Sequence, residues 1–234
     1  MPSMFEQLMD LPLFRGVSHD KMSQIVGQTK LHFLKYPAGE TLIRAGEPSK
    51  HLTFILTGSV RGVIVNTNGR FAVGQTLKAP AVLSADFLFG RYTNSPSTVT
   101  ALDDVSILKI SKNDYTKMLN ADSVFMFNYL NTLSANAQKG LHGILSLTNG
   151  DIDERIAFWI SALTQPGSTD IVLQCRKRDL CSLFGVQRAV FDAGLESMKE
   201  RGLIEYTSNE LKVIDREKLL ALLHHNNEMD EPAV

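Results

Sequence analysis

The stretch from Arg176 to Ile204, RKRDLCSLFGVQRAVFDAGLESMKERGLI, constrains the fold more than any other part of the chain. Apolar residues recur in it at intervals of three and four, which place side chains on one face of a helix. These residues are Leu180, Leu183 and Phe184 before Gly185, and Phe191, Leu195 and Met198 after it. The short break at 185–187 predicts two steeply crossing helices. This helix-turn-helix arrangement can place its second helix in a DNA major groove, and an ordinary helical hairpin is the alternative.

The flanks of this stretch favour a winged helix. Two short apolar runs, Leu203–Tyr206 and Leu211–Ile214, surround a polar turn, which predicts a β-hairpin directly after the second helix. Upstream, residues 151–160 begin a helix with acidic residues in its first turn, where the helix dipole favours them. Its apolar positions, expected to complete a small core, are Ile156, Phe158, Trp159, Ile160 and Leu163.

Composition sets further bounds. A hydrophobic fraction of 44% and a charged fraction of 21% are typical of a soluble globular protein, and the net charge of −1 argues against non-specific coating of nucleic acid. No apolar run approaches the roughly 20 residues of a membrane span, and the N-terminus lacks the basic-then-apolar pattern of a secretion signal, so we expect a cytoplasmic protein without a membrane partner. Cys175 and Cys181 are the only cysteines. They exclude a four-cysteine iron–sulfur or zinc site within one chain, and we expect no metal site.

The region from His32 to Ile110 has the texture of a β-sandwich or barrel. Short β-rich runs alternate there with Gly, Pro, Asn and Ser. The runs are Leu31–Leu34, Thr41–Ile43, Leu52–Leu56, Val60–Val65, Phe71–Leu77, Thr98–Leu102 and Val105–Ile110. Between the fourth and fifth runs, Asn68-Gly69 predicts a hairpin with a type I′ turn. Before this region, residues 1–30 are expected to be helical, with a turn at 11–14.

A long helix follows, predicted over about 121–148 and roughly 40 Å long at 1.5 Å per residue. A heptad seam runs along it, formed by Met126, Leu130, Leu133, Ala137, Gly140, Ile144 and Leu147. The seam favours a parallel dimer, and packing on the chain's own β-domain is the alternative. Gly140 and Gly143 are explained if two backbones approach closely there, or if the end of the helix must adjust. Asn149, Gly150 and Asp151 then form a predicted hinge.

Taken in order, these elements resemble the cyclic-AMP receptor protein / fumarate–nitrate reductase regulator superfamily of bacterial transcription factors. The most specific stretches are Tyr36–Glu47, Leu52–Val60, Asp151–Ala157 and the helix-turn-helix. The resemblance implies an α+β fold: an N-terminal β-roll, or jelly roll, like a cyclic-nucleotide-binding domain (1–120), a dimerisation helix (121–148), a winged helix (149–221) and a polar tail (222–234). It also implies a homodimer on a two-fold symmetric operator, contact with RNA polymerase, and an effector acting through the β-roll.

The effector site departs from the family pattern. Family members that bind cyclic nucleotides carry Phe-Gly-Glu and, about ten residues later, Arg-Ser-Ala, whose arginine pairs with the cyclic phosphate. Here Ser95 stands at the arginine position, and no Gly-Glu pair is present. Burying the phosphate without that charge-assisted contact would cost several kcal/mol, so the sequence argues against cyclic AMP. Haem stays an alternative, with His32, His51, His142 or the chain terminus as its axial ligand.

Other residues of the region define a candidate effector pocket. They are Val82, Leu83, Ser84, Phe87, Phe89, Arg91, Ser95, Ser97 and Thr98. Their apolar members could surround a small hydrophobic ligand or form a filled core, and Arg91 either reaches an anion or is solvated. The effector itself is not identified by the sequence.

The second helix of the helix-turn-helix supplies the candidate base contacts. Arg188 matches the family arginine that reads guanine, and such a bidentate contact contributes about 1–3 kcal/mol. Gln187 precedes it and either reaches a base edge or caps the helix. Ala189 and Ala193 stand where the family commonly has a glutamate and a second arginine, so only thymine methyl contacts remain for them.

Affinity for DNA must therefore come from cations around this helix. They are Arg176, Lys177, Arg178, Lys199, Arg201 and, on the wing, Lys212. Residues 151–218 hold ten Lys/Arg and twelve Asp/Glu, so this part is not basic overall. A solvated helix start is the alternative interpretation of 176–178.

Two rival functions remain beside a dimeric DNA-binding regulator. In the first, a small-molecule-sensing module uses its winged helix for protein contacts, which the acidic residues of the second helix favour. In the second, the chain is an enzyme. This is the weaker, because the P-loop, His-Glu-x-x-His and Gly-x-Ser-x-Gly patterns are absent and no catalytic residues can be assigned.

Overall fold

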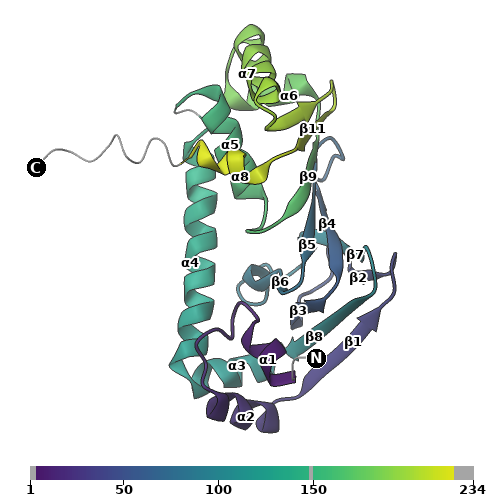
Figure 1. Ribbon diagram of the computed structural model, residues 1–234, viewed down its shortest axis with the longest axis vertical. Coiled ribbons are helices and arrows are strands. Elements are labelled where there is room, and N and C mark those ends of the chain that lie inside the picture. Colours follow the sequence, from purple (N-terminus) through teal and green to yellow (C-terminus); the bar gives the residue numbers. More distant parts are fainter. Residues whose placement is uncertain (1–3, 148–149, 224–234) are drawn as a thin grey trace, which may run out of the picture. The chain divides into compact units, whose positions relative to one another are not determined.

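The computed structural model describes residues 4–147 and 150–223 (Figure 1). Its helices are α1 (Met4–Met9), α2 (His19–Gln28), η1 (Ala85–Phe87, a 3-10 turn), α3 (Lys112–Ala121), α4 (Ser123–Leu145), α5 (Ile152–Leu163), α6 (Lys177–Phe184), α7 (Arg188–Glu200) and α8 (Arg216–Ala221). Its strands are β1 (Leu31–Tyr36), β2 (Thr41–Ile43), β3 (His51–Thr57), β4 (Ser59–Val65), β5 (Ala72–Lys78), β6 (Ala81–Leu83), β7 (Ser97–Ala101), β8 (Val105–Ser111), β9 (Thr169–Gln174), β10 (Ile204–Tyr206) and β11 (Glu210–Val213). No helix among these residues is both long and apolar enough to cross a membrane.

The chain forms two compact units, and their boundary does not follow the sequence linearly. The first unit joins the residues up to Gly62 with Leu77–Asn136, and the second joins Val63–Thr76 with the chain from Ala137 onward. The second unit therefore contains the tip of the β4–β5 hairpin, which is inserted in the sequence of the first. The helix α4 begins in the first unit and ends in the second.

The first unit is the predicted β-roll. Its four-stranded sheet has the order β1-β8-β3-β6, and β4, β7 and β2 form a second layer. Apolar side chains from both layers, among them Ile55, Val60, Val99 and Ile107, build one core between them. The antiparallel register places Lys109 of β8 opposite Thr53 of β3.

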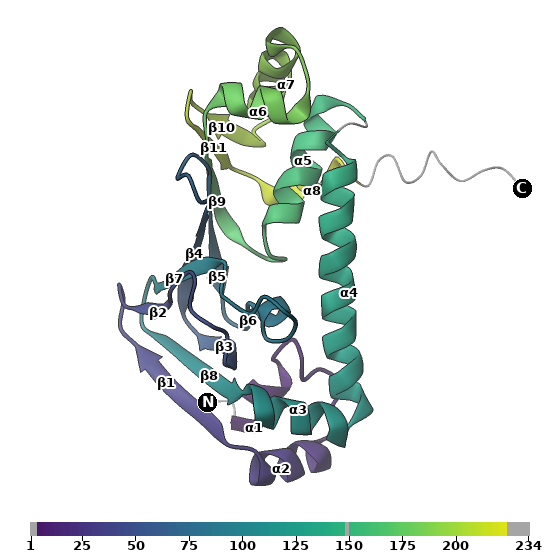
Figure 2. The ribbon, with the colours of Figure 1, turned by 180° about the vertical axis from the view of Figure 1, so that it is seen from behind.

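A second core lies on the other face of the four-stranded sheet. Strand residues such as Phe54 and Leu108 alternate outward and pack with α1, α2, α3 and the start of α4, which gather beside β8 in Figure 2. Phe14 and Phe54 meet edge to face with ring centroids 5.4 Å apart. Phe125 and Tyr129 of α4 are buried in the same core, so this face of the long helix packs on its own β-roll.

The predicted strands of the roll are confirmed to within one or two residues at each end, while β6 was not predicted. The β4–β5 hairpin is also confirmed, but its turn type was predicted wrongly. Gly69 has φ +67°, whereas Asn68 has no positive φ, and the Gly69 N–H donates to the Asn66 carbonyl at 3.0 Å. This is a type I turn that ends in a left-handed glycine, and six residues (66–71) rather than two separate β4 from β5.

The second unit contains the predicted winged helix (Figure 1). The hairpin of β10 and β11 extends to β9 and then to β5, in the strand order β10-β11-β9-β5. Phe191, Leu195 and Met198 of α7 are fully buried in its core, as predicted. The prediction for Leu183 was wrong: its side chain is 44% exposed, and Cys181 instead fills the inner face of α6. The α6 helix, Lys177–Phe184, has only eight residues, so it does not bury both Cys181 and Leu183.

Candidate functional site

The turn between α6 and α7 has the geometry that the sequence predicts. Gly185 ends α6 in the left-handed region with φ +62°, where the absence of a Cβ removes the steric penalty. The Val186 N–H then donates to the Cys181 carbonyl at 3.3 Å, which closes the end of α6. Gln187 is the extended N-cap of α7, although its side chain makes no capping hydrogen bond. The recognition helix therefore begins at Arg188.

The first turn of α7 is open to solvent. Gln187, Arg188, Ala189 and Val190 are exposed, and the Arg188 side chain is 83% exposed. The opposite face is fixed, because a side chain added at Gly194 would clash with Ile152 at the start of α5. This end of α7 can therefore reach a ligand as large as a nucleic-acid groove while its inner face stays rigid.

Acidic side chains neutralise most of the predicted cationic rim. Asp192 of α7 forms ion pairs with Lys177 Nζ at 2.8 Å and with Arg188 Nε at 3.7 Å. The other pairs are Arg176–Asp179 at 2.8 Å, Arg178–Asp179 at 3.8 Å, Lys199–Glu196 at 3.3 Å and Arg201–Asp153 at 2.9 Å. Among the described residues, Lys212 has no carboxylate within 4.0 Å. The surface around α7 is therefore a set of paired charges.

Lys177 and Glu196 are also connected through the wing. The Lys177 ammonium lies over the Tyr206 ring, 4.6 Å from its centroid, and only 21% of the side chain is exposed. The Tyr206 hydroxyl donates to Glu196 at 2.7 Å. This hydrogen bond lowers the pKa of Glu196, with a smaller effect from Lys199, and raises the pKa of Tyr206. Tyr206 of β10 thus holds both Lys177 and Glu196 in place.

An internal arginine that sequence reasoning did not select fixes the base of the helix-turn-helix. Arg155 of α5 is 9% exposed, and its guanidinium donates to the carbonyls of Leu147 and Phe184. It also lies over the Phe184 ring at 5.8 Å. The last turn of α6 is thereby tied to the segment that follows α4. Arg155 directly follows Asp153 and Glu154 in the sequence, so its residue type and neighbours gave no signal of this internal role.

The predicted hinge is only partly described. Asn149 lies outside the described residues. Gly150 has φ +83°, and Asp151 is the extended N-cap of α5, whose carbonyl accepts the Arg155 N–H at 3.0 Å.

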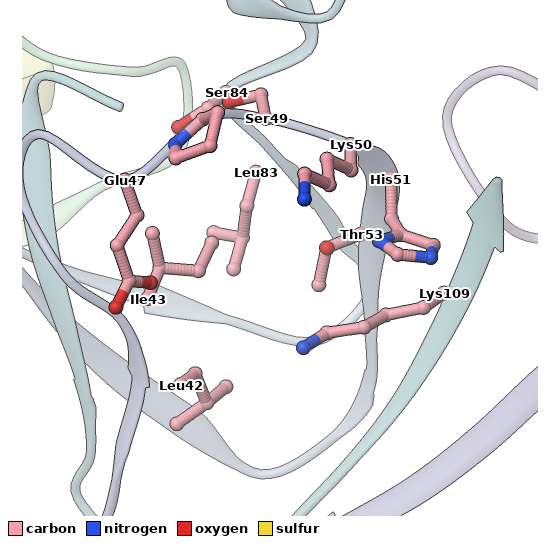
Figure 3. A pocket seen from close by; sticks show the side chains of 11 residues that line it. Leu42, Ile43, Glu47, Ser49, Lys50, His51, Thr53, Leu83, Ser84 and Lys109 are labelled. Atoms are coloured by element: carbon pink, nitrogen blue, oxygen red, sulfur yellow. The ribbon is translucent and has the colours of Figure 1, made fainter. Parts of the chain in front are cut away.

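The candidate effector residues do not surround one cavity. Val82 and Phe89 pack with Tyr129 in the core between the four-stranded sheet and the helices α1 to α4, whereas Leu83 lies in the core between the two sheet layers. Arg91 is exposed and lies beside the Tyr92 ring at 5.6 Å. Of the predicted set, Leu83 and Ser84 line the pocket of the β-roll that Figure 3 shows. The region of Val82 and Phe89 is a filled core.

The segment that would hold a cyclic phosphate has no cation of its own. Ser95 is 3% exposed, and its hydroxyl donates to the Ser97 carbonyl at 2.9 Å. Thr98 accepts the Ala45 N–H at 3.2 Å. Both hydroxyls thus form hydrogen bonds within the loop segments themselves. In the part of the chain that is described, no three His, Cys, Asp or Glu side chains form a metal-binding group.

A β-roll, a long helix and a winged helix with an exposed arginine at the start of its recognition helix define a regulator that carries a helix-turn-helix DNA-binding domain. Comparison with known families agrees. A cyclic nucleotide-binding domain model matches residues 33–122, and a Crp-like helix-turn-helix domain model matches residues 154–222, together more than half of the chain. The chain belongs to the CRP/FNR family of transcription regulators.

Relatives of known function are distant. The chain is 23% identical over 183 residues to the cAMP-activated global transcriptional regulator CRP of Haemophilus influenzae, covering 75% of this chain and 81% of that protein. It is 23% identical, also over 183 residues, to the cAMP-activated global transcriptional regulator Vfr of Pseudomonas aeruginosa, covering 74% and 85%.

Solved structures with a detectable likeness include two regulators. The catabolite activator protein of Thermus thermophilus is 18% identical with a TM-score of 0.48, covering 92% of this chain and 99% of that one. DNR from Pseudomonas aeruginosa is 18% identical with a TM-score of 0.43, covering 92% and 95%. At these scores the likeness adds no weight to the assignment, which the two domain models carry.

Proposed function

We propose that this regulator is a homodimer that binds a palindromic operator through α7 and is modulated by an effector at its β-roll. One observation carries the DNA-binding part: Arg188 is exposed at the first position of a recognition helix whose other face is buried. An arginine there can donate two hydrogen bonds to guanine O6 and N7 in the major groove. Two such helices in a symmetric dimer would read half-sites about one helical turn, or 34 Å, apart.

Exposed apolar residues along α4 support the dimer. Met126, Leu130 and Ile144 of the predicted seam are exposed, and Ile144 has 67% of its surface accessible in the single chain. Ala137 is exposed as well, while Leu133, Gly140 and Leu147 are partly covered. Burying such a row against a second α4 would remove from water apolar area that the single chain leaves uncovered.

The two glycines of α4 differ in their surroundings. A methyl group added at Gly140 meets no atom of the chain within 4 Å, whereas one added at Gly143 would clash with Ala162 of α5. Close approach at Gly143 is therefore explained within one chain. We expect Ile144→Glu to convert the dimer to a monomer in sedimentation equilibrium, and Glu6→Gln in α1 to leave it unchanged. A wild-type protein that sediments as a monomer at micromolar concentration would contradict the proposal.

DNA binding is tested with genomic fragments in a gel shift. We expect Arg188→Ala to weaken binding by about 1–3 kcal/mol and to relax discrimination between fragments. Arg91→Ala, which removes an exposed arginine of the β-roll, is the control and should leave binding intact. Equal binding by wild type and Arg188→Ala, with both proteins dimeric, would remove Arg188 from the proposed readout.

The effector is proposed to be a molecule other than cyclic AMP. Ser95 occupies the position of the family's phosphate-binding arginine, and the structure shows its hydroxyl engaged with Ser97. The two similar proteins from Haemophilus and Pseudomonas are named for activation by cAMP, and the proposal distinguishes this chain from them. RNA polymerase is the second proposed partner, as expected of a regulator that acts at promoters.

Protein contacts by the winged helix remain the second candidate function. The observation that favours it is the acidic half of α7, where Asp192 and Glu196 pair with cations that would otherwise face phosphates. Fragment binding that is absent at every salt concentration, together with an intact dimer, would select this alternative.

A further inference from the structure

A small cavity lies in the β-roll, entirely within the first unit, and is lined by residues of β2, β3, β6, β8 and the loop before β3 (Figure 3). Its volume is about 170 Å³, below the roughly 300–1,000 Å³ of pockets that hold drug-sized ligands. Leu42, Ile43 and Leu83 form an apolar side, and the first and last of these are buried in the core between the sheets. The cavity therefore suits a molecule of few atoms that has an apolar part.

The opposite side of the cavity is cationic. Lys50 precedes β3, and Lys109 of β8 lies in register with Thr53 of β3. Figure 3 shows both ammonium groups and the Thr53 hydroxyl directed into the same space. Lys109 approaches the Tyr36 hydroxyl at 3.4 Å, and within the described chain neither lysine has a carboxylate within 4.0 Å. The two positive charges thus have no internal counter-ion.

Thr53 adds a polar group to the cationic side. The residue is 3% exposed and lines the cavity, where Figure 3 draws its hydroxyl facing the two ammonium groups. A ligand with an acceptor atom in the cavity would receive a hydrogen bond from this hydroxyl.

The remaining charged groups around the cavity leave it cationic. Glu47 lines it, but its carboxylate accepts the Arg44 N–H at 3.3 Å and lies 3.9 Å from the Arg44 guanidinium. Burial, followed by the charges of Lys109, His32 and Lys50, lowers the pKa of His51 at the rim. Hydrogen bonds from Ser111 and Lys117 lower the pKa of Asp114, which is paired with Lys117 at 3.0 Å.

We propose that this cavity binds a small organic carboxylate. Its carboxylate group lies between Lys50 and Lys109 and accepts a hydrogen bond from Thr53, while its short hydrocarbon chain contacts Leu83 and the apolar side. Inorganic phosphate would satisfy the cations but leave the apolar side without a partner. The inference rests on the proposed function only in naming this ligand as the effector, because the binding itself requires neither a dimer nor DNA.

The test is calorimetric titration of the full-length protein with butyrate in a buffer of low chloride. We expect saturable binding of one butyrate per chain, weaker binding of inorganic phosphate, and none of the neutral isostere butyramide. Lys109→Met should weaken butyrate binding roughly ten- to a hundredfold, since it removes a charged hydrogen bond. Thr53→Val keeps the side-chain volume and should weaken binding about three- to tenfold.

Lys35→Met is the matched control. Lys35 is an exposed lysine of β1, lies opposite Ser106 in register and does not line the cavity. It should bind butyrate as the wild type does. Absence of saturable butyrate binding, equal binding in Thr53→Val and wild type, or preference for phosphate over butyrate would each overturn the proposal.

Titration of His51 by NMR gives a second readout. A bound anion offsets the neighbouring cations, so butyrate should raise the pKa of His51, and butyramide should not. An unchanged His51 pKa at saturating butyrate would place the ligand elsewhere. Operator affinity measured with and without butyrate then tests the proposed effector control separately.

Discussion

Replacing Asp192 by asparagine should tighten DNA binding, because this carboxylate pairs with two cations that the interface requires. Asp192 lies 2.8 Å from Lys177 and 3.7 Å from Arg188. An exposed ion pair contributes roughly 0.2–1 kcal/mol. Both cations must exchange Asp192 for DNA, so the carboxylate costs the complex roughly 0.4–2 kcal/mol, which corresponds to about a two- to thirtyfold change in Kd.

Fluorescence anisotropy with a labelled genomic fragment measures this change. The gain should be largest at low salt, because added ions screen both the internal pairs and the phosphates. Asp104→Asn, which alters the net charge equally at an exposed position of the β-roll, is the control and should change Kd little. Unchanged or weaker binding by a normally folded Asp192→Asn protein would refute the view that Asp192 competes with DNA.

Three further outcomes are expected. Gly143→Ala should lower the free energy of unfolding by about 1–2 kcal/mol in thermal melts, because the added methyl group would clash with α5. Phe71→Ala should cost about 2 kcal/mol in urea unfolding followed by Trp159 fluorescence, since the two rings lie 5.5 Å apart and Phe71 is only partly buried. Burial raises the pKa of Cys175 to about 11, and Cys181 is also buried, so neither should react with iodoacetamide at pH 8 until the protein unfolds, as mass spectrometry would show.

Local periodicity made much of the fold predictable. Phe191, Leu195 and Met198 lie on one helical face, and Gly185 separates two such faces, so the helix-turn-helix could be read directly. Short β-rich runs located seven strands for the same reason. Leu183 was misplaced because α6 is only eight residues long, and a helix this short allows several apolar faces.

Long-range pairing was not predictable in the same way. Strand β5 pairs with β9, with Val73 opposite Leu173, across a separation of a hundred residues. Backbone hydrogen bonds carry no side-chain signature, so the sequence cannot show which distant strands will meet. The cavity lined by Lys50 and Lys109 was not predicted for the same reason: Thr53 and Lys109 become neighbours only through the β3–β8 register. A lysine among the apolar residues of β8 was the available signal.

The most direct test of the account is the stoichiometry of the complex with DNA. Sedimentation of the protein with a bound genomic fragment should show two chains per duplex, and Arg188→Ala should form this complex only at higher protein concentration while remaining a dimer. A complex with one chain per duplex, or an Arg188→Ala protein that forms the complex at the wild-type concentration, would contradict a symmetric pair of recognition helices.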